Sequence, residues 1–261
     1  MVMENAAKST ESETPLARDG VKTALRTLDV FEAFRVARTP LSLTELARVI
    51  GSPVSSCSAL IHTLKGEGYL YHPGNGRKLY PTKRLLEQAQ EIARHDPLLQ
   101  RLLPALTDLR DETGETVILG KLQDDAVVYL ELLEGLQTVR YTARAGDIKP
   151  LHASAIGKAL LGTLPEAARE RLLARITLSA NTPHTITVAD ALRADLDAGR
   201  AAGLFVTRGE NVVDVMALAT VVAPQGEALG IALAGPLNRM ETHFAAYSAA
   251  LHRCRDILES A

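Results

Sequence analysis

Apolar residues recur at helical spacing in the first third of the chain and predict three consecutive helices, over 21–37, 40–51 and 52–70. In the first of them, the residues expected to share one buried face are Val21, Leu25, Leu28, Phe31 and Phe34. The segment 68–82 follows as two short strands around a Pro-Gly-Asn-Gly turn. Three helices and a hairpin in this order are typical of a winged helix-turn-helix.

Polar residues mark where the second and third helices begin. Ser42 and Glu45 have the spacing of a capping box, in which each side chain bonds a free backbone N–H of the first turn. Gly51 is placed to end that helix. Ser52 is the expected N-cap of the third helix, with Pro53 in its first turn.

The rest of the chain alternates between helical and strand-like patterns. An amphipathic stretch over 83–95 predicts a linker helix, which Asp96 and Pro97 break, and a further helix covers 98–114. The strands expected beyond it cover 115–122, 126–134, 138–146, 217–222 and 228–234. The further helices expected cover 153–162, 165–176, 188–203 and 237–260. Together these elements predict an α+β domain with a central antiparallel sheet.

Charge is distributed unevenly along the chain. The net charge of all 261 residues is −2, which on its own argues against binding to nucleic acid. Residues 18–95, however, carry a net charge of +5, whereas residues 96–261 carry −5. This asymmetry favours one domain that meets phosphate and one that does not. The expected organisation is a disordered tail over 1–17, a DNA-binding domain over 18–82, the linker helix over 83–96 and an effector-binding domain over 97–261.

Other global features narrow the class of protein. The first residues lack the basic-then-apolar pattern of a signal peptide, and no apolar run reaches the length of a membrane span. Cys57 and Cys254 offer neither metal-ligand spacing nor a disulfide framework. These features predict a cytoplasmic protein with no membrane partner, metal or cofactor.

Three segments together resemble the IclR family of bacterial transcription regulators. They are the helix-turn-helix stretch from Val21 to Leu70, the segment Leu-His-Ala-Ser-Ala-Ile-Gly-Lys-Ala-Leu-Leu-Gly at 151–162, and the stretch from Gly203 to Arg239. The middle segment is the most specific. The resemblance implies an N-terminal winged helix-turn-helix, a linker helix and a C-terminal effector-binding α/β domain similar to a GAF fold. It also implies homodimers, often paired into homotetramers on operator DNA.

Polar and basic residues of the N-terminal domain are the candidates for contact with double-stranded DNA. A recognition helix turns its N-terminal half toward the bases of the major groove. Basic residues on the first helix and at the hairpin tip can reach phosphates or the minor groove. The predicted DNA-contacting residues are Arg18, Lys22, Arg26, Ser52, Ser55, Ser56, Ser58, His62, Lys65, Arg77 and Lys78. Lys83 and Arg84 continue this basic track, and the simpler alternative for each residue is an ordinary surface position.

Val54 and Ala59 stand where the family usually has lysine and arginine. Because arginine and lysine make the strongest contacts to guanine, this departure predicts weak direct readout of bases, or reliance on methyl contacts and DNA shape. It also leaves an alternative function open. The chain could be a ligand sensor that acts through protein contacts, with weak and non-specific binding to DNA.

The second and third segments of the resemblance imply an effector pocket. Its implied lining consists of Ser154, Ala155, Ile156, Gly157, Thr207, Val215, Ala217, Ala232 and Ala234. A helix N-terminus offers free N–H groups and the positive end of a dipole, so residues 154–157 suit a carboxylate. Family members that bind small oxo-acids have Asp, Cys and Ser at four of these positions, where this chain has Thr207 and three alanines. The alanines favour a larger, flatter and more apolar effector, such as an aromatic acid.

His152 and Ser154 raise the question of catalysis. A serine hydrolase is not favoured, because Ser154 lies outside a Gly-x-Ser-x-Gly elbow and no third orienting acid is identifiable. A P-loop is not favoured either, because His152 stands where the upstream glycine is needed, five residues before Gly157. The alternative to a ligand role is that both side chains only cap a helix. The sequence therefore predicts a regulator that is not an enzyme. It leaves repressor and activator both open, and a repressor is expected only because repressors are the more common of the two.

Overall fold

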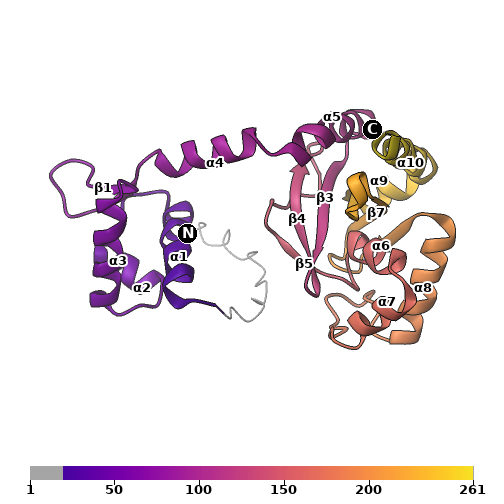
Figure 1. The fold of residues 1–261 in the computed structure, drawn as a ribbon, viewed down its shortest axis with the longest axis horizontal. Coiled ribbons are helices and arrows are strands. Elements are labelled where there is room, and N and C mark those ends of the chain that lie inside the picture. Colours follow the sequence, from indigo (N-terminus) through magenta and orange to yellow (C-terminus); the bar gives the residue numbers. More distant parts are fainter. Residues whose placement is uncertain (1–19, 261) are drawn as a thin grey trace, which may run out of the picture. The chain divides into compact units, whose positions relative to one another are not determined.

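The computed structural model describes residues 20–260, so the expected tail over 1–17 and the candidate Arg18 lie outside the described residues. The chain divides into two compact units, one up to His95 and one from Asp96 onward. Figure 1 shows the elements of both units along the chain.

The N-terminal unit has the predicted order of a winged helix-turn-helix. Its elements are α1 (Lys22–Ala37), α2 (Leu43–Val49), α3 (Val54–Gly66), β1 (Leu70–Tyr71), β2 (Tyr80–Pro81) and α4 (Arg84–Arg94). β1 and β2 pair antiparallel, which makes the hairpin the wing. The core that joins α1, α2, α3 and the hairpin contains Val30, Phe34, Leu46, Cys57, Ile61, Leu64, Leu70 and Leu79.

The buried face of α1 differs from the predicted one. Val21 is 74% exposed and Leu28 is 67% exposed, whereas Val30, Ala33 and Phe34 are buried. Both sets of residues have helical spacing, and packing against α2 and the wing buries the face that carries Val30 and Ala33 rather than the face that carries Val21 and Leu28.

The two predicted helix starts have different outcomes. The capping box at α2 is confirmed: the Glu45 N–H donates to Ser42 Oγ, and the Ser42 N–H donates to the Glu45 carboxylate at 2.7 Å. The N-cap predicted for the next helix is wrong by one residue. Pro53 is the N-cap of α3, and Ser52 makes no capping hydrogen bond because it lies outside the helix.

The C-terminal unit is built on one antiparallel six-stranded sheet with the order β5-β4-β3-β8-β7-β6. The strands are β3 (Thr116–Gln123), β4 (Ala126–Leu133), β5 (Ile148–Pro150), β6 (Phe205–Arg208), β7 (Val215–Val222) and β8 (Leu229–Pro236). The helices are α5 (Pro97–Thr113), α6 (Ala155–Thr163), α7 (Glu166–Leu173), α8 (Ala189–Ala202), α9 (Leu237–Thr242) and α10 (Phe244–Ser260), with a 3-10 turn at Pro224–Gly226. The predicted α+β class with a central antiparallel sheet is confirmed.

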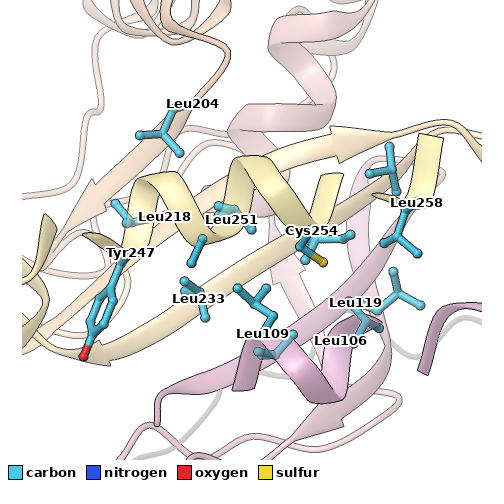
Figure 2. Close-up of a cluster of buried hydrophobic side chains, with 14 of the residues drawn as sticks. Leu106, Leu109, Leu119, Leu204, Leu218, Leu233, Tyr247, Leu251, Cys254 and Leu258 are labelled. Atoms are coloured by element: carbon cyan, nitrogen blue, oxygen red, sulfur yellow. The ribbon is translucent and has the colours of Figure 1, made fainter. Parts of the chain in front are cut away.

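Each face of this sheet has its own apolar core. On one face, α5 and α10 cover a cluster that includes Leu106, Leu109, Leu119, Leu251 and Leu258 (Figure 2). On the other face, α6 and α8 cover a cluster that includes Ile118, Ile156, Leu160, Leu192 and Leu196. The second face carries the start of α6, and with it the candidate effector pocket.

Two expected elements of this unit are wrong. The segment 138–146 forms no strand, because the free edge of β4 pairs with β5 and Tyr141 is held instead by a hydrogen bond from Thr116 Oγ1 to its carbonyl oxygen at 2.6 Å. The expected terminal helix is interrupted at His243. The interruption lets Met240 of α9 and Leu251 of α10 enter the same core.

Candidate DNA interface and effector pocket

The recognition helix α3 buries one face and exposes the other. Cys57, Ile61 and Leu64 point into the core of the N-terminal unit. The predicted DNA-contacting residues of this helix are all exposed, namely Ser55, Ser56, Ser58, His62 and Lys65. Val54 and Ala59 are exposed on the same helix. The face offered to a partner is therefore polar but has few positive charges.

Ser52 differs from the other candidate serines. Its Oγ is buried and has no hydrogen-bond partner among the described residues. A hydroxyl in this position is not presented to solvent, so the structure gives no direct route from Ser52 to a phosphate or a base.

The wing is tied to the end of the recognition helix through a histidine. Lys65 Nζ lies 3.0 Å from His72 Nε2, and His72 Nδ1 lies 2.8 Å from the carbonyl oxygen of Lys78. Arg77 and Lys78 are exposed on the same hairpin. The contacts thus bring basic residues of the helix and of the wing together on one part of the surface.

The other basic candidates fall into two groups. On α1, Lys22 is exposed and Arg26 is half-buried. Arg84 is exposed but has a structural role: its guanidinium donates to the carbonyl oxygen of Glu67 and lies 5.1 Å from the ring centre of Tyr69. Arg84 therefore fastens the start of α4 to the end of α3, and Lys83 beside it is exposed.

One pocket brings together eight of the nine residues expected to bind the effector. Those eight are Ser154, Ala155, Ile156, Thr207, Val215, Ala217, Ala232 and Ala234. Strand pairing explains how, since Ala217 pairs with both Ala234 and Thr207 across β6, β7 and β8. The pocket has about 410 Å³ of empty space, part of which is open to solvent.

The start of α6 supplies hydrogen-bond donors to the pocket. Ser154 is the N-cap, and its Oγ accepts the Gly157 N–H at 3.2 Å and donates to the Pro150 carbonyl oxygen at 2.7 Å. The N–H groups of Ala155 and Ile156 belong to the first turn, so they have no acceptor within the helix. Both residues line the pocket. This arrangement can bind a carboxylate through the backbone.

Gly157 does not line the pocket. A Cβ at this position would collide with the carbonyl oxygen of Leu151, so the glycine permits close packing of α6 on the preceding segment. His152 is held by a different contact, because its Nε2 lies 2.9 Å from the carbonyl oxygen of Ser179 in the segment between α7 and α8. Burial lowers the pKa of His152, with a smaller contribution from Lys158. His152 therefore acts as a structural residue.

The structure adds lining residues that the sequence did not suggest. They are Ile118, Tyr129, Tyr141, Ala153, Asn211 and Val212. The strand pattern could have identified Tyr129, because it lies two residues after buried Val127 on β4 and therefore faces the same side of the sheet. Tyr141 and Asn211 had none, because both lie in irregular segments.

A layer of hydrogen bonds holds the segment that contains Asn211. Thr182 Oγ1 donates to the Gly209 carbonyl oxygen and Thr185 Oγ1 donates to the Glu210 carbonyl oxygen, each at 2.6 Å. The amide nitrogen of Asn181 donates to Asn211 Oδ1 at 2.9 Å. These bonds fix one wall of the pocket in a defined position.

A winged helix-turn-helix linked in one chain to an α+β domain with a pocket at the start of a helix is typical of one class of protein, the ligand-responsive transcriptional regulators. The chain matches the model of the IclR helix-turn-helix domain over residues 23–74 and the model of the bacterial transcriptional regulator IclR C-terminal domain over residues 90–258. The chain therefore belongs to the IclR family of transcriptional regulators. It has the DNA-binding and effector-binding domains of that family.

Individual relatives agree with this assignment. The "Probable transcriptional regulator SauR" of Cupriavidus necator is 32% identical over 226 residues, which cover 83% of this chain and 87% of the relative. The crystal structure of the Thermotoga maritima IclR protein has a TM-score of 0.78 at 23% identity and covers 91% of this chain and 97% of its own. An IclR homologue from Microbacterium hydrocarbonoxydans, complexed with 4-hydroxybenzoate, has a TM-score of 0.72 at 25% identity. The match covers 92% of this chain and 100% of the homologue.

Every helix within residues 20–260 is too short or too polar to cross a membrane.

Proposed function

We propose that this regulator is a cytoplasmic repressor whose binding to operator DNA is controlled by an aromatic carboxylic acid. The observation that carries the proposal is the pocket in the C-terminal unit. Its floor contains Ala217, Ala232 and Ala234, and its lining includes the first turn of α6. The floor is apolar and lacks bulky groups, while the first turn offers backbone donors to an anion.

The alanine floor favours a flat ring over a two- or three-carbon oxo-acid. Each alanine ends at Cβ and so leaves room above the sheet, and Ile118 and Val215 add apolar surface around that room. A ring packed there would lose contact with water over its face, which is favourable by about 25 cal/mol per Å² of apolar surface. The homologue complexed with 4-hydroxybenzoate supports this ligand class.

The DNA interface of the proposal consists of the exposed residues of α3, the wing and α1. Arg26, Arg77 and Lys78 would contact phosphates, and the serines of α3 would contact phosphates or bases. Because α3 exposes Val54 and Ala59 rather than basic residues, shape and phosphate contacts would contribute much of the affinity. Such binding weakens steeply as salt concentration rises.

The linker helix α4 supports a homodimer. Leu85, Leu86 and Ile92 are 41%, 53% and 74% exposed, and no residue of α4 is buried. An apolar stripe of this kind becomes stable when a second copy covers it. In such a dimer the separation of the two winged helices must match the half-sites, about 34 Å per helical turn of DNA. Effector binding would shift that separation, and dimers could pair into tetramers.

The proposal assigns no catalysis to the chain. Both of the side chains that raised the question are occupied by structural hydrogen bonds, His152 with Ser179 and Ser154 with Pro150 and Gly157. A second candidate function is a ligand sensor that acts through protein contacts. The exposed Val54 and Ala59 on the recognition helix favour it, and it predicts no preference among DNA sequences.

Calorimetric titration of the full-length protein tests the effector class. We expect benzoate or a substituted benzoate to bind, and Ala217→Leu to weaken that binding by filling the pocket. Ala201→Leu, on the exposed surface of α8, is the matched control and should leave affinity unchanged. Tight binding of a two- or three-carbon oxo-acid, together with no binding of any aromatic acid, would contradict the proposal.

A further inference from the structure

His72 joins the recognition helix to the wing through both nitrogens of its ring. It directly follows β1, and its Nε2 lies 3.0 Å from Nζ of Lys65, which belongs to the last turn of α3. Its Nδ1 lies 2.8 Å from the carbonyl oxygen of Lys78, on the returning side of the hairpin. One ring nitrogen is therefore engaged by each of the two elements that carry candidate DNA contacts.

The two partners determine where the proton of the ring lies. A lysine ammonium group has donors only, so Nε2 of His72 must accept the hydrogen bond from Lys65. A carbonyl oxygen only accepts, so Nδ1 must carry the proton and donate it to Lys78. A charged ring would carry a donor on both nitrogens and would lose the contact with Lys65. His72 is therefore neutral in this arrangement, with its proton on Nδ1.

The carbonyl group that holds His72 belongs to a well-anchored part of the wing. Leu79 directly follows Lys78 and is only 2% exposed in the core of the N-terminal unit. It exchanges two backbone hydrogen bonds with Leu41, at 2.7 and 3.1 Å. The contacts that run from Lys78 through His72 thus hold the exposed side chain of Lys65 against the core of this unit.

A neutral imidazole holds the ammonium group of Lys65 without cancelling its charge. Arg35 on α1 shows the opposite case, because its guanidinium is paired with the carboxylate of Glu32. Lys65 keeps its charge, and two of its three donors are left for another acceptor. A free lysine side chain loses rotamer freedom when it binds a phosphate, and a lysine that is already held loses less. His72 therefore prepares Lys65 for contact with an anion.

We propose that His72 is a positioning residue for DNA binding, which holds the ammonium group of Lys65 where the recognition helix meets the wing so that it contacts a backbone phosphate. The inference rests on the proposed DNA interface and adds a residue that the sequence did not suggest. Arg77 and Lys78 are exposed on the same hairpin, so the phosphate meets positive charge from both elements. A contact of this kind strengthens binding to every DNA sequence alike.

Fluorescence anisotropy tests this role, with the full-length protein and labelled DNA from upstream of its own gene. Lys65→Met should reduce the slope of log affinity against log salt by about 0.9, the value for one phosphate contact. His72→Asn keeps a donor near the position of Nδ1 but offers Lys65 no acceptor, so it should reduce the slope by about half as much or more. His72→Gln places an amide oxygen near the position of Nε2 and should keep the wild-type slope.

A double variant shows whether His72 acts through Lys65. In the Lys65→Met background, His72→Asn should change neither the affinity nor the slope, because the side chain that it positions is gone. Equal weakening by His72→Asn in both backgrounds would overturn the inference, since His72 would then only support the wing. His95→Gln is the matched control, because the His95 side chain is 71% exposed at the end of α4, and it should keep the wild-type slope.

The position of the ring proton gives a readout that does not depend on DNA. In long-range proton–nitrogen NMR spectra of the full-length protein with isotope-labelled histidine, in mildly alkaline buffer, we expect His72 to carry its proton on Nδ1. The His72 signals are those that disappear in His72→Gln. A proton on Nε2 would overturn the inference, as would an equally reduced salt slope in His72→Gln and His72→Asn. Wild-type protein without any salt-dependent binding to DNA would overturn the DNA interface itself, and the inference with it.

Discussion

The ammonium group of Lys158 on α6 lies 2.7 Å from the carboxylate of Glu210 and 2.8 Å from that of Asp195 on α8. Lys158 has no exposed surface, and Glu210 directly precedes Asn211 of the pocket wall. The ion pair therefore joins the helix that supplies the backbone donors to the segment that closes the opposite wall. A buried charge is tolerated only when it is paired in this way.

We expect Glu210→Gln to destabilise the C-terminal unit by about 3 kcal/mol, because the variant leaves the buried Lys158 with only the half-exposed Asp195. Urea denaturation followed by circular dichroism measures the change. Asp190→Asn is the matched control, since Asp190 is 91% exposed and pairs with Arg193 at the surface. Equal stability of the two variants would show that the buried pair does not hold the pocket wall.

The pKa of His152 predicts a pH dependence of folding. Burial lowers this pKa in the folded protein, so the unfolded chain, with a value of about 6.5, binds the proton more readily. Stability should therefore fall as pH decreases below about 6.5. The raised pKa of Glu210, which burial causes, acts in the opposite direction, because the folded protein binds that proton more readily than the unfolded chain.

Comparison of wild type with His152→Gln isolates the histidine. Urea unfolding at pH 7.5 and at pH 5.5 should show a smaller loss of stability in the variant than in the wild type, since every other titrating group is shared. An identical pH dependence in both proteins would mean that His152 does not contribute.

The two cysteines report separately on the two units. Cys57 is buried in the core of the N-terminal unit, and Cys254 is buried between α10 and α5. Burial raises the pKa of Cys254 to about 11, with a contribution from Asp108, and burial also raises the pKa of Cys57. Because the thiolate is the reactive form, native protein should react slowly with a thiol reagent and rapidly in urea. Rapid labelling of either thiol in native protein would indicate that its unit opens readily.

Arg26 provides the sharpest test of the DNA interface on α1. If its guanidinium contacts a phosphate, Arg26→Ala should weaken operator binding and reduce the slope of log affinity against log salt by about 0.9. Arg35→Ala on the same helix is the matched control, because Arg35 is already paired with Glu32. Fluorescence anisotropy with labelled operator DNA at several salt concentrations measures both quantities. Equal slopes for wild type and Arg26→Ala would place Arg26 away from the phosphates.

Local signals in the sequence predicted the elements that short-range interactions determine. The capping box of Ser42 and Glu45 fixed the start of α2. The strand patterns over 115–122 and 126–134 predicted β3 and β4, which are joined by a turn that contains Asp124, with φ of +55°. The alanine lining of the pocket was expected from the resemblance to the IclR family. The strand pairing explains why these residues meet, since the alternation of β7 and β8 places Ala217 and Ala232 on one face.

Features that depend on tertiary packing were not predictable in the same way. The exposed Leu28 has the same helical spacing as buried residues, and only contact with α2 and the wing distinguishes the two faces of α1. Tyr141 reaches the pocket from an irregular segment, so no periodicity marks it. Ser52 has the residue type of an N-cap, but the chain places Pro53 there instead.

Binding of the full-length protein to the intergenic DNA upstream of its own gene, with and without aromatic acid, tests the central claim most directly. We expect saturable binding that survives excess random DNA, weakens as salt increases and responds to the acid at the concentrations that occupy the pocket. Binding that random DNA removes equally well, and that no aromatic acid changes, would contradict a ligand-controlled operator-binding regulator and favour the sensor that acts through protein contacts.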